Sequence, residues 1–364
     1  MLKYILKRIG YSILVLLGVS LIMYFLVRLM PVDYIQSKID QMNQGGATVQ
    51  LDTQFAMYDT YGLDYPDKLI QAKIDDLTEK GKLSEIPEWE AMMSGESGWA
   101  KVEKIFKGYF TWLGNLLRLD LGISFKYGVP VADKIAQHMG TSFMIALIAT
   151  IFEFLIAIPL GITAATHQYS LRDYVVTILV MVGISLPSFF FGNVLKNWLS
   201  LQLGWFPPQG LVDATMSYTG VALLVDYVKH LFIPILTVVI LSIGARMRMT
   251  RTNMLEVMNS DYIRTARAKG LKESVVINKH AFRNTLIPLV TSMAGLLPSL
   301  FSGAIITEQV FDLPGIGNVA LVAMQIGDIP FIMGYNMFLA VLSVVGVLFA
   351  DVMYAVVDPR VKLE

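Results

Sequence analysis

The sequence predicts an all-α membrane protein with six transmembrane helices. Only 16% of its 364 residues are charged and 55% are hydrophobic, whereas a soluble domain usually carries about 25% charged residues. A bilayer core of about 30 Å needs roughly 20 apolar residues in a helix, and each such stretch must be helical because lipid offers backbone amides no partner. The predicted spans are residues 9–30, 139–164, 174–200, 221–245, 286–307 and 334–357.

The Lys and Arg content of the connections sets the orientation of these spans, because cytoplasmic loops are enriched in both residues. Residues 246–283 carry nine Lys or Arg against three acidic residues. The connections 201–220 and 308–333 contain neither Lys nor Arg. We therefore expect a multi-pass protein of the cell (plasma) membrane with both termini in the cytoplasm.

The polar stretch between the first two spans, residues 31–138, is expected outside the membrane. It holds eleven Lys or Arg and sixteen Asp or Glu, a net charge of −5, and its length frees it from the charge rule. Apolar residues at helical spacing in 65–81 predict a helix there, so we expect a small, mostly helical insert. It is either a docking surface for a substrate-delivery protein or a solvated cap without a specific role.

These features divide the chain into four parts. Residues 1–30 hold the cytoplasmic amino end and the first span, whose apolar core is too long for a signal peptide. Residues 31–138 are the extracytoplasmic segment. Residues 139–357 are a core of five spans with a cytoplasmic loop at 246–284, and residues 358–364 are a cytoplasmic tail.

Within the loop 246–284, the sequence SDYIRTARAKG predicts one short helix with both ends specified. Ser260 is a good N-cap, able to accept a hydrogen bond from a free amide, and Asp261 places negative charge at the positive end of the helix dipole. Gly270 suits the left-handed position that ends a helix. We therefore predict a helix from Asp261 to Lys269 that Gly270 closes.

Ala266 and Ala268 have small side chains, so the helix could fit closely into a groove of a partner protein. A partner-docking helix is therefore one interpretation of the loop. The other is an ordinary basic loop, because nine cations satisfy the positive-inside rule without a well-capped helix.

The stretch DYIRTARAKGL, followed by KHAFRNTLIPL, resembles the coupling loop of binding-protein-dependent ABC transporter permeases, and specifically their peptide and nickel branch. The general pattern of that family is Glu-Ala-Ala, three residues, then Gly. Counted back from Gly270, these positions hold Arg264, Thr265 and Ala266, so the Glu is absent. An Arg-Thr-Ala variant is usual in the peptide branch. The absence of the Glu therefore points to a peptide-branch permease and not to ABC permeases in general.

Further blocks extend the resemblance to the B-type oligopeptide permease subunit over most of the chain. Residues 73–104 look like an insertion between two of them. The matching blocks are 3–31, 61–64, 112–125 (WLGNLLRLDLGISF), 183–192 (GISLPSFFFG), 308–317 (EQVFDLPGIG) and 351–360 (DVMYAVVDPR).

The resemblance implies a type I ABC importer transmembrane fold and a permease subunit without catalytic residues. The partners that it implies are a second, C-type permease subunit, two ABC ATPase subunits and an extracytoplasmic substrate-binding protein. The lipid bilayer surrounds the chain itself, and no nucleic acid is expected. ATP and Mg are expected on the ATPases, because this chain has no GxxxxGK(S/T) motif. We expect it to bind no cofactor or metal, and it contains no cysteine. The implied ATPase-coupling helix comprises Tyr262, Ile263, Arg264, Thr265, Ala266, Arg267, Ala268, Lys269, Gly270 and Leu271.

Charged and proline residues inside the spans are the other candidates. Glu153 lies midway along the second span, where an ionised carboxylate costs about 3 kcal/mol on insertion scales. It is either a pathway group near the amino terminus of a peptide or a structural partner of a polar group on a neighbouring helix, and we favour the second. Asp351 is interpreted as structural, and Pro159, Pro187 and Pro234 are expected to kink their helices.

Oligopeptides are the expected substrate, because the resemblance to the B-type peptide subunit is closest. Nickel or another small solute is the alternative within the same branch. A secondary transporter that works alone would place paired ionisable groups and broken helices at the midplane, for which Glu153 alone is thin support. A membrane enzyme such as an intramembrane protease would need HExxH, GxSxG or two mid-span aspartates, which the sequence lacks.

Overall fold

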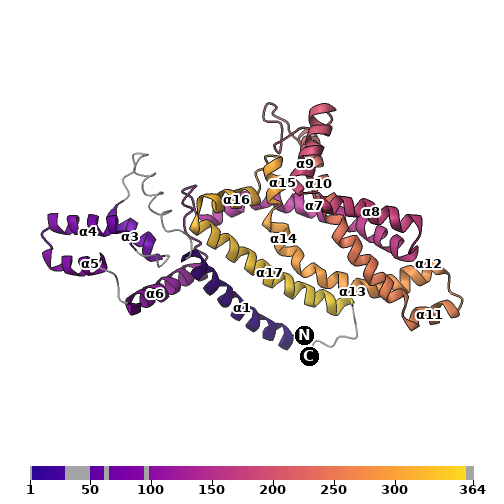
Figure 1. Ribbon diagram of the computed structural model, residues 1–364, viewed down its shortest axis with the longest axis horizontal. Helices are drawn as coiled ribbons and strands as arrows, with labels where there is room; N and C mark the ends of the chain where they lie inside the picture. Colours follow the sequence, from indigo (N-terminus) through magenta and orange to yellow (C-terminus); the bar gives the residue numbers. More distant parts are fainter. Residues whose placement is uncertain (1, 29–49, 61–64, 94–97, 358–364) are drawn as a thin grey trace. The chain divides into compact units, whose positions relative to one another are not determined.

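The computed structural model describes residues 2–28, 50–60, 65–93 and 98–357, and these are almost entirely helical (Figure 1). In these ranges the only β feature is an isolated antiparallel bridge between Ile123 and Pro130. In chain order the helices are α1 (Leu2–Arg28), α3 (Leu51–Thr60), α4 (Asp67–Glu79), η1 (Leu83–Glu85), α5 (Ile86–Met93), α6 (Gly98–Leu117), α7 (Val131–Thr166), α8 (Leu171–Ser185), α9 (Ser188–Leu195), η2 (Lys196–Gln202), α10 (Val221–Met258), α11 (Asp261–Ala268), α12 (Glu273–Val275), η3 (Val276–Ala281), α13 (Phe282–Ser292), η4 (Met293–Gly295), α14 (Leu296–Ser302), α15 (Ile305–Val310), α16 (Ile316–Ile326) and α17 (Ile329–Val357).

Four described helices, α1, α7, α10 and α17, are long and apolar enough to cross a bilayer, and so is the segment Glu273–Val310, which consists of several short helical pieces. There are six spans if one bent pair counts as a single span. The six apolar stretches of the sequence fall in these elements. The second and sixth spans begin earlier than predicted, at Val131 and Ile329. The last eight residues of the predicted outer segment, 131–138, are therefore part of α7.

The third predicted span, residues 174–200, is the bent pair. α8 ends at Ser185, α9 begins at Ser188, and the two helical directions differ by 103°. Pro187 lies at the break, where its missing amide hydrogen cannot continue the helical ladder. The expected kink is thus a full break, whereas Pro159 and Pro234 lie inside the long helices α7 and α10.

The fourth span continues well past its predicted end. α10 runs to Met258, so residues 246–258 are helix and not loop. The apolar stretch ends at Ala245 because Arg246 follows. The helix can still continue, because the part of a helix that has left the bilayer does not need to be apolar on every side. The predicted cytoplasmic loop 246–284, with its short helix at 261–269, therefore begins with a continuation of α10 that the sequence analysis did not predict.

One compact unit contains residues from Ile13 to Lys134 and from Ala323 to Met337. Its core is rich in aromatic side chains, including Tyr24 of α1, Phe55 of α3 and Trp112 of α6. The helix predicted in residues 65–81 is α4, and its apolar stripe is buried as expected, with Leu69, Ile70 and Leu77 as its most buried members. The described part of the segment 31–138 is thus mostly helical.

A buried aspartate directly before α17 binds the segment that follows α6. Asp328 is fully buried and accepts hydrogen bonds from the hydroxyl of Ser124 at 2.5 Å and from the amides of Phe125 and Lys126, both at 3.0 Å. These donors follow α6 in a segment without regular helix, so the carboxylate satisfies amides that no helical ladder pairs.

The second compact unit contains residues up to Ser12, from Ile135 to Val322, and from Phe338 onward. Within it, Arg8 of α1 pairs with Asp351 of α17 at 3.2 Å. Asp351 therefore has a structural partner in the amino-terminal helix. The predicted cytoplasmic tail, residues 358–364, lies outside the described residues.

A second buried carboxylate organises the connection between α14 and α16. Glu308 is fully buried, and its Oε1 accepts from the Ser142 hydroxyl at 2.6 Å and the Ala304 amide at 3.1 Å, while Oε2 accepts from the Asn318 amide at 2.9 Å. Ser142 Oγ in turn accepts from the Ile316 amide at 2.8 Å. The carboxylate therefore holds both sides of this connection against α7.

Replacing Glu308 with Gln is predicted to destabilise the protein by about 1–3 kcal/mol, because one carboxylate oxygen becomes an NH2 group that faces a buried donor. The measurement is thermal unfolding of the purified protein in detergent. Replacing the exposed neighbour Gln309 with Ala is the control and should leave the midpoint unchanged. Equal midpoints for both variants would show that Glu308 is not an anchor.

Candidate functional site

The predicted coupling helix is present as α11, which runs from Asp261 to Ala268. Lys269 occupies the C-cap, where its amide donates to the Thr265 carbonyl at 3.1 Å. Gly270 follows with φ of +75°, the left-handed conformation that the sequence predicts. An added Cβ at Gly270 would meet no atom within 4 Å, so its backbone conformation alone favours glycine there.

Ser260 takes the N-cap position but does not cap the helix with its side chain. Its backbone is extended, as expected for an N-cap, yet its hydroxyl donates to the carbonyl of Val257 at 2.6 Å. The prediction of a side-chain cap was therefore wrong. The physical reason is that α10 ends only two residues earlier, so its last carbonyls lack helical donors and compete for the hydroxyl.

Ala266 was predicted to lie on the surface that a partner would meet, and this was wrong. Ala266 and Ile263 are buried against Met254 of α10, Ala165 of α7 and Val276 of η3. Residues three apart share one face of a helix, and here that face anchors α11 to its own chain. The face left exposed contains Tyr262, Arg264, Thr265, Arg267 and Ala268.

An ion pair shapes the turn that follows α11. Arg267 donates from Nη2 to Glu273 Oε1 at 2.7 Å and from Nε to both carboxylate oxygens at 3.2 Å. These hydrogen bonds, together with the negative charge of Glu273, raise the pKa of Arg267 above its usual value. Arg267 is therefore cationic at any physiological pH, with its charge balanced by Glu273, and Arg264 likewise pairs with Asp261 at 3.5 Å on the exposed side of α11.

Glu153, the candidate polar site within the membrane, pairs with a cation on a neighbouring helix. Its Oε1 accepts from Arg246 Nε at 3.0 Å, and Arg246 Nη1 also donates to Ser292 at 2.8 Å. The same guanidinium lies over the ring of Phe154, 4.6 Å from its centroid. This arrangement gives Glu153 the structural partner that we favoured from the sequence, while a role in a transport pathway stays a prediction.

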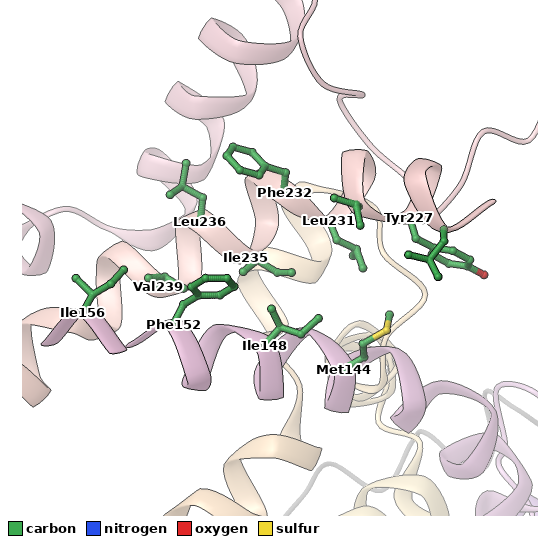
Figure 2. A pocket seen from close by; sticks show the side chains of 12 residues that line it. Met144, Ile148, Phe152, Ile156, Tyr227, Leu231, Phe232, Ile235, Leu236 and Val239 are labelled. Carbon is green, nitrogen blue, oxygen red and sulfur yellow. The ribbon is translucent and has the colours of Figure 1, made fainter. Parts of the chain in front are cut away.

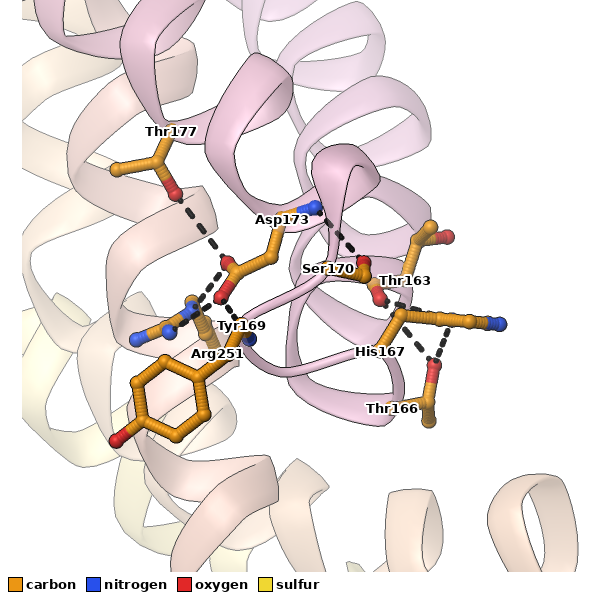
Figure 3. A network of polar contacts seen from close by, with 8 residues as sticks. All are labelled: Thr163, Thr166, His167, Tyr169, Ser170, Asp173, Thr177 and Arg251. Carbon is orange, nitrogen blue, oxygen red and sulfur yellow. Dashed lines mark hydrogen bonds and ion pairs between the residues drawn. The ribbon is translucent and has the colours of Figure 1, made fainter.

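A second buried ion pair was missed by sequence reasoning (Figure 3). The carboxylate of Asp173, at the start of α8, accepts from Arg251 Nε at 3.0 Å and from Arg251 Nη2 at 2.9 Å. It also accepts from the amide of Tyr169 at 3.1 Å. The amide of Asp173 in turn donates to the hydroxyl of Ser170, the N-cap of α8. The spacing Ser-x-x-Asp before an apolar run is a known helix-start pattern and could have identified this residue.

Both pairs change how the basic segment 246–283 is understood. Nine cations were counted there from the sequence, but Arg246 and Arg251 belong to α10 and bind carboxylates within their own chain. They are therefore not part of a surface open to a partner. The cations of α11 and its C-terminal turn remain on the exposed side.

A cavity of about 680 Å³ lies between α7 and α10 (Figure 2). Ile148 and Phe152 of α7 line it opposite Leu231 and Ile235 of α10, and none of its twelve lining residues is charged. Burying the charged ends of a peptide there would leave them without partners, which is costly. The cavity therefore suits hydrocarbon, and we do not assign it to the substrate.

Comparison with known proteins agrees with this geometry. A model of the family described as binding-protein-dependent transport system inner membrane component matches residues 157–363. Oligopeptide transport system permease protein AppB of Bacillus subtilis is 39% identical over 255 residues, which cover 70% of this chain and 79% of AppB. Dipeptide transport system permease protein DppB of Escherichia coli is 29% identical over 379 positions, which cover 100% of this chain and 99% of DppB.

One solved structure is also similar. It is an inward-facing form of the MetNI methionine ABC transporter, with a TM-score of 0.47 and 17% identity over 62% of this chain and 96% of that chain.

The helical spans, with the short helix α11 beside them, define a multi-pass membrane protein. The chain belongs to the binding-protein-dependent transport system inner membrane components, and among them to the peptide and dipeptide permeases of ABC importers. This membership carries the type I ABC importer transmembrane fold. It also implies that an ATPase and a substrate-binding protein work with the chain.

Replacing Gly270 with Val is predicted to strain the turn after α11 by roughly 1–2 kcal/mol, because a β-branched residue resists the left-handed conformation. We expect membrane insertion to persist and substrate-stimulated ATPase activity of the assembled transporter to fall. Gly270→Asn is the matched control, since Asn tolerates this conformation better. Wild-type stimulation in the Val variant would show that this turn does not matter for coupling.

Proposed function

We propose that this chain forms half of the translocation pathway of an oligopeptide importer and couples it to separate ATPase subunits through residues 262–271. The observation that carries the proposal is α11 itself. It is a short helix whose apolar face, Ile263 and Ala266, is buried against its own subunit, and whose other face is exposed and carries the polar side chains Arg264, Thr265 and Arg267. A helix fixed in this way presents a defined surface to a separate protein.

The chain contributes no catalytic group of its own to ATP hydrolysis in this proposal. Its sequence lacks a GxxxxGK(S/T) phosphate-binding loop, whose backbone amides and lysine would hold the phosphates. ATP and Mg therefore bind to two partner ATPases. A second, C-type permease subunit completes the pathway, and an extracytoplasmic binding protein delivers the peptide.

The proposed orientation places α11 and both termini in the cytoplasm, as the distribution of Lys and Arg favours. ATP binding closes the ATPase pair and moves α11, and the spans then change from an inward-open to an outward-open arrangement. Such a change is a rigid-body transition between two packings. Hydrolysis restores the first arrangement.

Oligopeptides are the proposed substrate because the relatives named above, at 39% and 29% identity, are named for oligopeptide and dipeptide transport. A small solute such as nickel is the second candidate within this branch. A metal ion would require ligands on the delivery protein or in the pathway. Among the described residues, no group of three or more His, Asp or Glu is placed to hold a metal ion.

The proposal predicts that affinity purification of this chain from its native membrane brings down two ATPase polypeptides and a second permease in fixed ratio. Once reconstituted in liposomes with the binding protein, the complex should take up labelled oligopeptides only when ATP is present. Nickel uptake by the same liposomes serves as the comparison. Uptake of nickel but not of peptide would contradict the proposed substrate. Purification of the chain alone in an active state would contradict the proposed coupling to separate ATPases.

A further inference from the structure

Two arginines on the second half of α10 tie this helix to three other spans. Arg246 binds Glu153 of α7 and Ser292 of α13, and Arg251 binds Asp173 of α8. The arginines are five residues apart, so at 3.6 residues per turn their side chains leave the helix about 140° apart. α10 is thereby held on two different sides.

The Arg251–Asp173 pair is built into the packing of the helices. The side chain of Asp173 is 5% exposed, and both of its oxygens accept from the guanidinium, a geometry that gives direction as well as strength. The hydroxyl of Thr177 and the amide of Tyr169 complete its set of donors. The carboxylate therefore cannot turn away from Arg251 without losing several hydrogen bonds at once.

Tyr169 shows how firmly the turn before α8 is held. Its φ is +60°, a left-handed conformation that aromatic residues rarely adopt. Such a conformation persists only where the surroundings determine it. Here the hydrogen bond from its amide to Asp173 provides that constraint, so the α7–α8 turn and the ion pair form one unit (Figure 3).

Close helix contacts restrict sliding of α10 past its neighbours. A Cβ added at Gly244 of α10 would lie 2.2 Å from Ile184 Cδ1 of α8, and one at Gly161 of α7 would lie 2.7 Å from Thr250 Cβ. Small residues allow such close approach of helices in membranes. The ion pairs and these contacts together join the adjoining halves of α7, α8 and α10.

α10 leads directly from this region to α11. Only Asn259 and Ser260 separate Met258, the last residue of α10, from Asp261. In addition, Ile263 of α11 packs against Met254 of α10. A force applied to α11 therefore acts on the helix that carries Arg251.

From this arrangement we infer that Arg251 and Asp173 are positioning residues for energy coupling, which carry the displacement of α11 to α8, the first half of the bent third span. The inference rests on the proposed function, because it takes an ATPase to act on α11. α8 has no other ionic connection to α10 among the described residues. Without the pair, only uncharged packing contacts such as that of Gly244 with Ile184 would connect α8 to α10, and the coupling between the two helices would be looser.

The test uses the complete transporter reconstituted in liposomes with its second permease subunit, ATPases and binding protein. The key variant combines Asp173→Asn with Arg251→Gln, because removal of both charges leaves no buried charge unpaired. A second variant, Asp173→Arg with Arg251→Asp, exchanges the two charges. The matched control is Arg248→Gln, which removes an exposed cation from the same helix.

We measure basal ATPase activity, ATPase activity stimulated by peptide-loaded binding protein, and peptide transported per ATP hydrolysed. The neutral double variant should assemble and retain basal ATPase activity. Its peptide transported per ATP should fall roughly tenfold, within the range usual for coupling between sites. The exchanged pair should recover part of this loss, and Arg248→Gln should match wild type.

Two results would overturn the inference while the proposed function stands. If the neutral double variant transports as much peptide per ATP as wild type, the pair transmits nothing. If that variant does not assemble although wild type does, the pair serves folding only. A wild-type complex without ATP-dependent peptide uptake would instead refute the proposed function, and the inference with it.

Discussion

The ion pair between Arg251 and Asp173 is the interaction on which the rest of the inner part of the protein depends. Both oxygens of the buried carboxylate accept from the guanidinium, a geometry that gives direction as well as strength, so the pair fixes the relative position of α8 and α10. α10 in turn carries α11, whose apolar face closes the core that it shares with α7 and η3. The surface proposed to meet the ATPase is therefore determined by contacts that lie behind it.

Buried carboxylates recur wherever a connection between helices must be held. Asp173 accepts a hydrogen bond from the amide of Tyr169, and Asp226 accepts one from the amide of Asp213 at 2.8 Å. Glu308 accepts hydrogen bonds from two amides that flank α15, and Asp328 accepts them from two amides after α6. In each case the donors belong to turns, helix starts or connections whose amides lack a helical acceptor. One acidic side chain thus replaces the helical ladder at each of these four places.

The spans and the end of α11 could be predicted from sequence because they depend on local properties. Apolar length decides where a helix crosses lipid, and the left-handed turn at Gly270 needs only its own backbone. The buried pairs could not be predicted, because Arg251 and Asp173 are 78 residues apart and Ser142 and Glu308 are 166 apart. The errors at Ser260 and Ala266 have the same origin, since both residues make contacts with α10 that their own segment does not reveal.

The central claim is that α11 and the start of α8 move together, and it can be tested by one distance. The chain contains no cysteine, so spin labels can be attached specifically after replacing the exposed residues Asp261 and Leu171 with Cys, both of which lie outside the proposed contact 262–271. In the reconstituted, transporting complex the distance between these labels should be the same in the nucleotide-free and ATP-bound states. A distance that changes when ATP binds would contradict the account.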